Sequence, residues 1–251
     1  MHVDLSDQTI LVTGASRGIG RAIARALGTS GARLAIHYHR TAEPAQALAD
    51  DLDAAEPFQA NLATVEGGVQ LFDDVTAAFG QVDGLVNNAG VAVQLPLDGS
   101  DDAWAEGWAR TMHVNLRAPE LLCRRAIRHF RTRGGGRIIN VASRAAFRGD
   151  TPDYMAYAAS KGGLVALTRS IARGFGDDGI VAFTLAPGFT RTDMAQDFID
   201  EYGEDYATSD LALSRLTEPD DIAPTAVFLA SGLADHATGA TIDINAGSYV
   251  H

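Results

Sequence analysis

Short apolar runs alternate along this chain with longer segments of helical period. The run "TILVT" (9–13) precedes "IGRAIARAL" (19–27), which is followed by "RLAIHY" (33–38). This alternation is typical of βα units, in which helices connect parallel strands. The apolar runs show little in-out alternation of polarity, as expected for strands that helices cover on both faces. The pattern therefore predicts an α/β fold with a doubly wound parallel sheet of about seven strands.

The same alternation continues to the end of the chain. No internal repeat, low-complexity tract or Pro/Gly/Ser-rich linker divides the sequence, so residues 1–251 are expected to form one domain. The acidic segment 189–218 follows a predicted strand and is either a substrate lid or a solvated surface excursion; its position favours the lid. Further strands are predicted at 57–60, 84–88, 137–142, 180–186 and 240–244, and helices near 43–52, 64–79, 102–131, 154–175 and 219–231.

The chain is acidic, with a formal net charge of −12. Sequence-independent binding to nucleic acid or to an anionic membrane relies on a basic surface, so neither partner is expected. Segment 124–137 is a local exception, because it holds six arginines and no acid. It is either a basic helix C-terminus that complements the helix dipole or a docking patch for an acidic partner, and the first interpretation is favoured.

The single cysteine, Cys123, excludes an intrachain disulfide and a cysteine-rich metal site. No metal is expected, and Cys123 is interpreted as a small buried apolar residue. No run approaches the roughly 18 apolar residues of a membrane span. The opening "MHVDLSDQTILVTG" lacks the cationic start and long apolar stretch of a signal peptide. These features favour a cytoplasmic protein.

The glycine-rich sequence "TGASRGIG" (13–20) follows the first predicted strand and opens the first predicted helix. Gly14, Gly18 and Gly20 allow a tight turn and a close approach to a pyrophosphate, whose charge the N-terminal helix amides would meet. Glycines alone are weak evidence, because any tight strand-to-helix turn uses them. Their position nevertheless favours a dinucleotide site in a Rossmann-type domain. The residues between them, Ser16, Arg17 and Ile19, are cofactor-binding candidates in the same turn.

Lys161 is the only lysine of the chain, whose other nineteen basic side chains are arginines. It follows Tyr157 by four positions on a predicted helix, so the two side chains share a face, whereas Tyr154 lies two turns away. A free phenol has a pKa near 10, and a nearby ammonium lowers it toward the range that suits proton exchange with an alcohol. A compact ammonium also reaches a ribose hydroxyl better than the broad fork of arginine does. The alternative is a lysine placed by chance in an exposed helix turn.

Ser143 stands at the end of the fifth predicted strand, where ligands bind in this architecture. Its hydroxyl can hydrogen-bond a substrate oxygen. A lone serine at a strand end is usually structural, so Ser143 gains weight only from Tyr157 and Lys161.

Several further motifs follow the glycine turn in order from one end of the chain to the other. They are "LVNNAG" (85–90), Asn115 in "HVNL", Ser143, "YAASK" (157–161), "APG" (186–188) and "FLASGLADHATGATIDINAG" (228–247). With these motifs the sequence resembles the short-chain dehydrogenase/reductase family. It looks closest to the bacterial group that contains 3-oxoacyl-carrier-protein reductases, sugar-alcohol dehydrogenases and steroid dehydrogenases.

The resemblance implies a catalytic tetrad. Tyr157 is the general acid/base, Lys161 lowers its pKa and holds the nicotinamide ribose, Ser143 orients the substrate oxygen, and Asn115 supports a proton relay. A homotetramer that pairs through the helices near 102–131 and 154–175 is also implied. The implied cofactor contacts are Asn61 and Leu62 at the adenine, Asn88, Ala89 and Gly90 along the cofactor, and Pro187, Gly188, Thr190 and Thr192 around the carboxamide.

The sequence departs from the family pattern at three places. Ser143 and Tyr157 are fourteen positions apart, where the family more often has thirteen, so the loop 144–156 is expected to be remodelled. The adenine-contacting position is Asn61 rather than aspartate, and the C-terminal "DGG" is replaced by "NAG". No tetrad residue is lost, so these departures bear on the substrate and not on the activity.

The residues beyond the glycine turn indicate which dinucleotide is used. An acid about 20 positions after the turn would bind a ribose 2′-hydroxyl and repel a 2′-phosphate. The window reads "HYHR" (37–40), and no acid lies between the turn and Glu43. Tyr38 takes the place of the aspartate of NAD-dependent relatives, and His39 and Arg40 follow it. With Arg17 projecting toward the same pocket, these cations suit a phosphate. NADP(H) is therefore predicted, with NAD(H) as the alternative if Arg40 faces solvent and Arg17 caps the turn.

The leading expectation is an NADP(H)-dependent oxidoreductase that interconverts a small-molecule ketone or aldehyde and an alcohol by hydride transfer. One alternative is an inactive cofactor-binding regulator or scaffold of the same fold, which need not keep Tyr157 and Lys161 together. Another is an NAD-dependent alcohol or sugar dehydrogenase. A sugar-nucleotide epimerase is disfavoured by the glycine spacing and by the lack of a sizeable C-terminal substrate domain.

Overall fold

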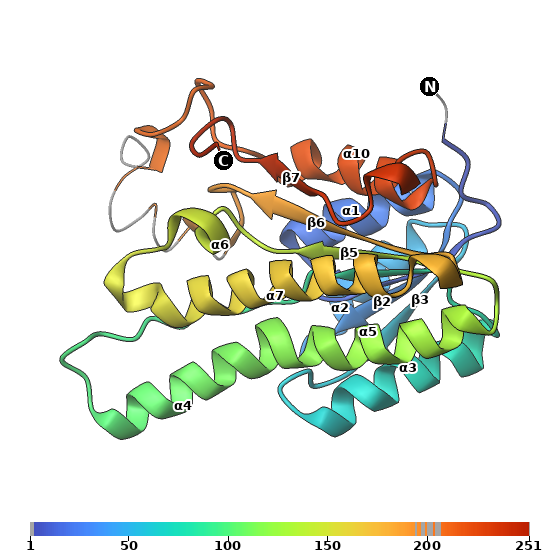
Figure 1. Cartoon of the computed structure of the whole chain (residues 1–251), viewed down its shortest axis with the longest axis horizontal. Helices are drawn as coiled ribbons and strands as arrows, with labels where there is room; N and C mark the ends of the chain where they lie inside the picture. Colours follow the sequence, from blue (N-terminus) through green and yellow to red (C-terminus); the bar gives the residue numbers. More distant parts are fainter. Residues whose placement is uncertain (1–2, 194, 197–198, 200–202, 204–206, 251) are drawn as a thin grey trace.

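The chain forms a seven-stranded, entirely parallel sheet with strand order β3-β2-β1-β4-β5-β6-β7 (Figure 1). The computed structural model describes residues 3–193, 195–196, 199, 203 and 207–250. The predicted α/β fold is confirmed, and each predicted strand is found within one or two residues of its expected ends. The strands are β1 (Thr9–Val12), β2 (Arg33–Tyr38), β3 (Ala55–Gln59), β4 (Gly84–Asn87), β5 (Gly136–Val141), β6 (Ile180–Pro187) and β7 (Thr241–Ile244).

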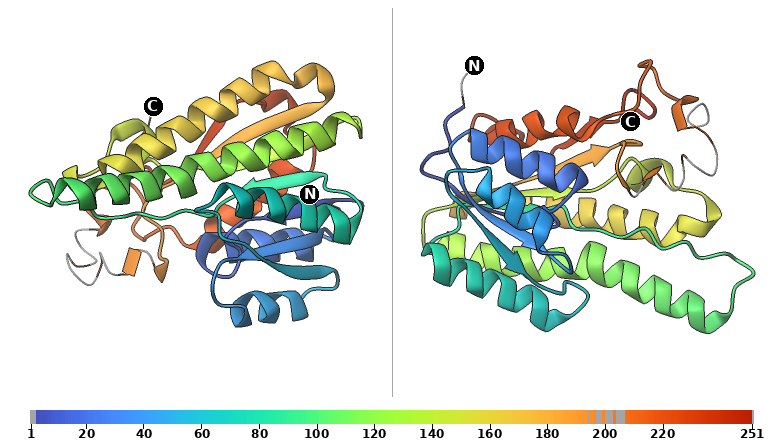
Figure 2. Two further views of the ribbon diagram at one scale, coloured as in Figure 1. Left: turned by 90° about the horizontal axis from the view of Figure 1, so that it is seen from below. Right: turned by 180° about the vertical axis from the view of Figure 1, so that it is seen from behind.

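Helices cover both faces of the sheet, as the apolar strands require (Figures 1 and 2). One apolar core packs α1, α2 and α10 against the sheet, and a second packs α3, α5 and α7 on the opposite face. Successive residues of β1 contribute to different cores, Val12 to the first and Leu11 to the second. The helices are α1 (Gly18–Thr29), α2 (Glu43–Asp50), α3 (Val65–Phe79), α4 (Asp101–Met112), α5 (Ala118–Arg131), α6 (Ala145–Arg148), α7 (Met155–Gly174) and α10 (Pro219–Ala230).

The strand order reverses between β1 and β4, because β2 and β3 extend the sheet on one side of β1 and β4 to β7 extend it on the other. A crevice for ligands opens at such a switch point, at the carboxyl ends of the strands. The glycine turn after β1 and the segment after β4 meet there. The topology therefore places the predicted cofactor residues of both segments at one edge of the sheet.

The predicted helix 102–131 is divided by a π-helical segment, His113–Arg117, between α4 and α5. The Ala118 amide donates to the His113 carbonyl, five residues back. This wider turn contains Asn115, which is fully buried. The apolar periodicity of the sequence gave no sign of the wider turn, because it depends on contacts that Asn115 makes elsewhere in the fold.

The loop 144–156, expected to be remodelled, contains the short helix α6 and a 3₁₀ turn at Pro152–Tyr154. The segment 189–218 is closed at its base by a bridge between Thr190 and Thr217. Part of this expected lid, including residues 194, 197–198, 200–202 and 204–206, lies outside the described residues. No helix in the described part of the chain is long and apolar enough to cross a membrane.

Gly136, the first residue of β5, provides a test of packing in the second core. A Cβ atom there would lie 2.4 Å from two ring carbons of the fully buried Phe130. We expect Gly136→Ala to lower the free energy of unfolding by about 1–3 kcal/mol, because the ring cannot move without displacing its neighbours. The measurement is urea denaturation. Gly176→Ala is the matched control, since nothing lies within 4 Å of its added Cβ, and equal losses in the two variants would contradict this packing argument.

Candidate active site

The glycine turn is pressed against the segment that follows β4. Gly14 and Gly18 have φ angles of +63° and +54°, in the left-handed region that favours glycine. A Cβ at Gly20 would lie 2.3 Å from the Gly14 carbonyl oxygen and from the Asn88 amide nitrogen. That amide donates to the carbonyls of Thr13 and Gly14, at 3.0 and 3.1 Å. The glycines therefore permit a close approach of two backbone segments.

The N-terminus of α1 has the features of a phosphate-binding helix start. It has no side-chain cap, and no acid lies in its first turn. Its amides therefore remain available for an anionic ligand, to which the positive end of the helix dipole is suited. The residues around Gly14, Gly18 and Gly20 thus fit a dinucleotide pyrophosphate.

The three other candidates in this turn lie differently. Ser16 is half-buried, and Ile19 is half-buried and packs against the first core. Arg17 is exposed and forms an ion pair of 3.4 Å with Asp193, at the start of the expected lid. The carboxylate of Asp193 attracts the Arg17 guanidinium in this structure, and the approach of Arg17 to the ribose pocket stays a prediction.

The adenine side of the crevice is bordered by the ends of β2 and β3. Tyr38 is half-buried and contacts the first core, while His39 and Arg40 are exposed. Asn61 is exposed and accepts a hydrogen bond from the Ala63 amide, at 3.0 Å. Leu62 is 6% exposed and packs in the second core, so its main chain is the part available to a ligand.

His37 on β2, which the sequence interpretation missed, hydrogen-bonds the glycine turn. It is buried, and its Nδ1 accepts the Gly14 N–H at 3.0 Å. Its Nε2 lies 3.2 Å from the Ala60 carbonyl and therefore has the proton and donates it. Burial lowers the pKa of His37 to about 4, so the ring is neutral at pH 7. The only sequence signal was a polar residue directly after the apolar run 34–36 of β2.

Three further segments contain the residues that are expected to lie near the nicotinamide. Thr192 lies close to the glycine turn, since a Cβ at Gly18 would be 3.3 Å from its methyl group. Gly90 approaches the tetrad, because its own added Cβ would lie 3.4 Å from Asn115 and 3.5 Å from the Lys161 nitrogen. The other predicted residues of these segments are the half-buried Ala89 and Gly188 and the buried Pro187 and Thr190.

Tyr157, Lys161 and Ser143 meet at the carboxyl end of β5. The Lys161 Nζ lies 5.7 Å from the centre of the Tyr157 ring, and the Ser143 hydroxyl hydrogen-bonds the Tyr157 phenol. Lys161 is 4% exposed and donates to the Val141 carbonyl at 2.8 Å. The prediction that Tyr157 and Lys161 share a helix face is confirmed, whereas an exposed, accidental lysine is not what the structure shows.

The pKa values in this group differ from the expectation. Burial raises the pKa of Tyr157; the Ser143 hydrogen bond opposes this shift and the charge of Asp150 adds to it. Burial also lowers the pKa of Lys161 to about 8. Desolvation therefore dominates the Tyr157 pKa in this arrangement, where the ammonium is directed at Val141, and the expected lowering by Lys161 stays a prediction.

Asn115 connects the tetrad to the segment after β4. Its amide oxygen accepts the Val91 N–H, and its amide nitrogen donates to the Val91 carbonyl, both at 2.8 Å. The same nitrogen donates to the Ser160 hydroxyl at 3.1 Å, and this hydroxyl donates to the Tyr157 carbonyl at 2.7 Å. Asn115 thus fixes Gly90 and the Tyr157 backbone in one network.

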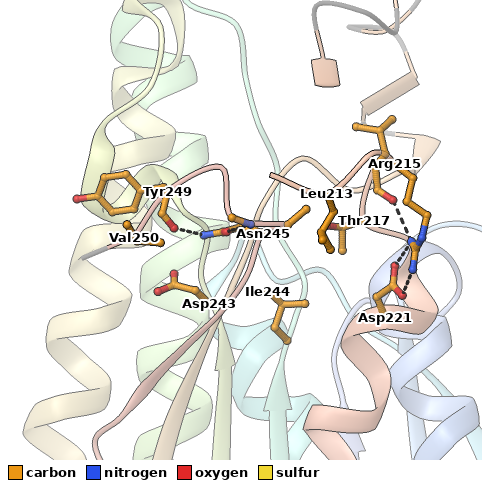
Figure 3. Close-up of a pocket in the computed structure, with 12 residues that line it drawn as sticks. Leu213, Arg215, Thr217, Asp221, Asp243, Ile244, Asn245, Tyr249 and Val250 are labelled. Carbon is orange, nitrogen blue, oxygen red and sulfur yellow. Dashed lines mark hydrogen bonds and ion pairs between the residues drawn. The ribbon is translucent and has the colours of Figure 1, made fainter. Parts of the chain in front are cut away.

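The two cavities described outside this crevice contain no tetrad residue. One, of about 340 Å³, lies between the end of the expected lid and the C-terminal segment, where Asn245 donates to the Tyr249 carbonyl and Arg215 pairs with Asp221 (Figure 3). The other, of about 260 Å³, lies beside Trp104 on α4. Tyr157 lines neither of these cavities, so we assign the chemistry to the crevice.

Comparison with known proteins identifies relatives along the whole chain. The sequence family described as Enoyl-(Acyl carrier protein) reductase matches residues 14–249. The 3-oxoacyl-(acyl-carrier-protein) reductase FabG of Staphylococcus aureus is 35% identical over 247 residues, which cover 97% of this chain and 98% of the relative. L-rhamnose 1-dehydrogenase (NAD(P)(+)) of Azotobacter vinelandii is 37% identical, with 98% of each chain covered. Similarity to a sugar dehydrogenase and to an acyl-carrier reductase indicates one reaction class with diverse substrates.

Solved structures share the fold. A candidate NAD(P) dependent gluconate 5-dehydrogenase from Beutenbergia cavernae, with NADP bound at low occupancy, superposes with a TM-score of 0.90 at 34% identity and covers 99% of both chains. A short-chain type dehydrogenase/reductase from Mycobacterium marinum superposes with a TM-score of 0.90 at 28% identity, covering 99% of this chain and 98% of that one.

His37 gives a pH-dependence that stability measurements can isolate. Because its pKa is about 4 in the folded chain and ordinarily 6.5, the unfolded chain binds this proton first as the pH falls. Neutral His37 therefore contributes up to about 3 kcal/mol to the free energy of unfolding above pH 6.5. This contribution is lost as the pH falls toward 4. We expect the stability advantage of the unaltered chain over His37→Asn, measured by denaturant unfolding, to shrink between pH 7 and 4.5. His39→Asn, at the exposed neighbour, is the control; an advantage that does not vary with pH would refute the assignment.

Proposed function

Since the chain belongs to the short-chain dehydrogenase/reductase family and is an NAD(P)-dependent oxidoreductase acting on CH–OH groups, we propose that it interconverts a ketone or aldehyde and an alcohol with NADP(H), using Tyr157 as general acid/base. The observation that supports this most is the contact of the Tyr157 phenol with the Ser143 hydroxyl, beside a buried Lys161. These three groups lie at the carboxyl edge of β5, next to the segments that border the cofactor crevice.

In the proposed mechanism the chain positions the carbonyl and handles its proton. Ser143 donates a hydrogen bond to the substrate oxygen, which places that oxygen beside the Tyr157 hydroxyl. When bound, the nicotinamide supplies or accepts the hydride at the carbon atom. During reduction Tyr157 gives its proton to the oxygen as negative charge develops there, and during oxidation it takes the proton back. Asn115 supports the return of a proton to Tyr157 from solvent.

The buried Lys161 has a defined electrostatic role in this proposal. Its ammonium stabilises an ionised Tyr157, because opposite charges interact strongly where water is excluded. In this structure the Lys161 ammonium donates one hydrogen bond, to the Val141 carbonyl. Another of its three N–H groups can donate to a ribose hydroxyl or to the phenol. Arginine would not fit this space, which Gly90 and Asn115 narrow. The tetrad geometry also argues against an inactive scaffold, since such a protein has no need of a buried lysine here.

The preference for NADP(H) rests on the absence of an acid at the end of β2. Tyr38, His39 and Arg40 occupy the rim where a 2′-phosphate would lie, and the latter two are exposed and free to approach it. Arg17 would have to leave Asp193, an exposed pair of small energetic value, to join them. The NADP bound to the Beutenbergia cavernae relative is consistent with this preference.

We also propose that the protein is a cytoplasmic homotetramer. Residues 1–251 form one catalytic domain in this proposal, and segment 189–218 is a substrate lid. In the proposed pairing surface, α4 and α5 follow one another end to end and α7 lies alongside them, on one face of the molecule (Figure 2). Trp104 and Trp108 stack on α4, with ring centres 6.3 Å apart, and provide apolar area for such a contact.

Replacement of the two neighbouring tyrosines tests the general acid. We expect Tyr157→Phe to lower kcat at least 100-fold, because proton transfer by a positioned group contributes about 10²–10⁴-fold, while the dissociation constant of NADPH changes little. Tyr154→Phe is the matched control and should retain activity within a few-fold. Steady-state kinetics on a panel of ketones and alcohols, with nucleotide binding by fluorescence, checks both. Similar losses in both variants would show that Tyr157 is not the acid.

Cofactor preference is tested by comparing kcat/KM for the two nucleotides. We expect NADPH to be preferred over NADH by at least tenfold. Tyr38→Asp introduces the acid that repels a 2′-phosphate, and Arg17→Ala removes a cation, so both variants should shift the ratio toward NADH. Arg173→Ala, at an exposed position near the end of α7, should leave the ratio unchanged. An equal or higher kcat/KM with NADH in the unaltered chain would exclude the preference.

A further inference from the structure

Two arginines next to the proposed catalytic serine converge on one carboxylate. Arg144 directly follows Ser143, and Arg148 is the last residue of α6. The Nη1 atoms of both donate to the same oxygen of Asp210, each at 2.8 Å. Asp210 belongs to the segment 189–218, which passes beside α6 (Figure 1). A carboxylate therefore already occupies the point between the two guanidinium groups.

The burial of Arg144 distinguishes this cluster from an ordinary surface ion pair. Its side chain is only 11% exposed, while those of Arg148 and Asp210 are 38% and 35% exposed. Among the described residues, the Arg144 side chain donates one hydrogen bond, to Asp210, although a guanidinium has five N–H donors. Desolvation and the nearby charge of Arg148 lower the pKa of Arg144. Two crowded cations with unused donors favour an anion that offers more acceptors than one carboxylate oxygen.

The same cluster is electrically coupled to the catalytic phenol. Asp150, two residues after Arg148, raises the pKa of Tyr157. Desolvation raises the pKa of Asp150, and the positive charges of Arg148 and Arg144 oppose this shift. Asp150 also accepts the Thr151 amide, at 2.9 Å. Asp150 thus couples the charges of both arginines to Tyr157, and Arg144 directly follows Ser143 in the chain.

We propose that Arg144 and Arg148 bind a carboxylate of the substrate, and that Asp210 occupies this subsite until the substrate replaces it. The inference rests on the proposed function and adds the class of substrate: an oxo acid or hydroxy acid. A substrate carboxylate has two oxygens and can accept from each guanidinium separately, which is the geometry that arginine forks match.

The position of the subsite restricts the length of the substrate. The guanidinium of Arg144 lies a full side chain away from the backbone next to Ser143, whose hydroxyl orients the reacting oxygen. The carboxylate and the carbonyl must therefore be separated by several bonds. The test substrates therefore have the oxo group several carbons away from the carboxylate.

Matched acids and esters test the subsite. With NADPH, we expect kcat/KM for 5-oxohexanoate or 7-oxooctanoate to be at least tenfold higher than kcat/KM for the methyl ester of the same acid. Arg148→Gln should lower this acid-to-ester ratio at least tenfold, and Asp210→Asn should raise it by lowering KM for the acid. Arg131→Gln and Asp178→Asn are matched controls, since they break an arginine–aspartate pair at the opposite end of the sheet. Equal losses on acid and ester in Arg148→Gln and Asp210→Asn would overturn the subsite and leave only a structural contact.

A binding measurement keeps this test independent of turnover. Hexanoate should raise the thermal unfolding midpoint of Asp210→Asn more than hexanamide does, and more than it raises that of the unaltered chain. Adding Arg148→Gln to Asp210→Asn should abolish the difference. If no ketone of the panel is turned over, the proposed function fails, and the hexanoate result still decides the subsite. No preference for hexanoate in Asp210→Asn would exclude it.

Discussion

The hydrogen bond from the Lys161 ammonium to the Val141 carbonyl joins α7 to the end of β5, and the geometry of the site depends on it. Val141 is the last residue of β5, and Ser143 follows two residues later. A buried ammonium must find acceptors, because an unpaired charge in a desolvated site is costly. By meeting this need at Val141, Lys161 fixes the rotation of α7, and with it the position of Tyr157 opposite Ser143.

A second set of polar contacts holds the cofactor side against the same sheet edge. Asn88 bonds the carbonyls of Thr13 and Gly14, and His37 accepts the Gly14 amide from the neighbouring strand. Thr13 adds to this by accepting the amides of Asn88 and Ala89, at 3.0 and 3.1 Å. The glycine turn is thus tied to the strands on both sides of β1, at the point where the strand order reverses. A rigid turn gives a ligand helix amides that are already oriented.

The sequence was sufficient for features that depend on local pattern. Apolar runs predicted the strands, and the spacing of Tyr157 and Lys161 predicted a shared helix face. It was insufficient where a property depends on residues distant in the chain. The π-helical turn at Asn115 reflects bonds to Val91 and Ser160, and the raised pKa of Tyr157 reflects burial and Asp150. The role of His37 follows from the approach of Gly14 and Ala60, which no periodicity could indicate.

The segment 189–218 contacts the two sides of the crevice through separate charges. Near its start Asp193 pairs with Arg17 of the glycine turn, and Asp210 pairs with Arg144 and Arg148 beside Ser143. Each pair is formed with a cation that the proposals assign to a ligand: a 2′-phosphate for Arg17 and a carboxylate for the other two. A bound 2′-phosphate would release the exposed Arg17–Asp193 pair, which is weak. A bound carboxylate would replace Asp210, which offers the two guanidinium groups only one oxygen. The relatives act on different substrates by their names, and this segment and α6 are where such differences can arise without disturbing Lys161 or the sheet.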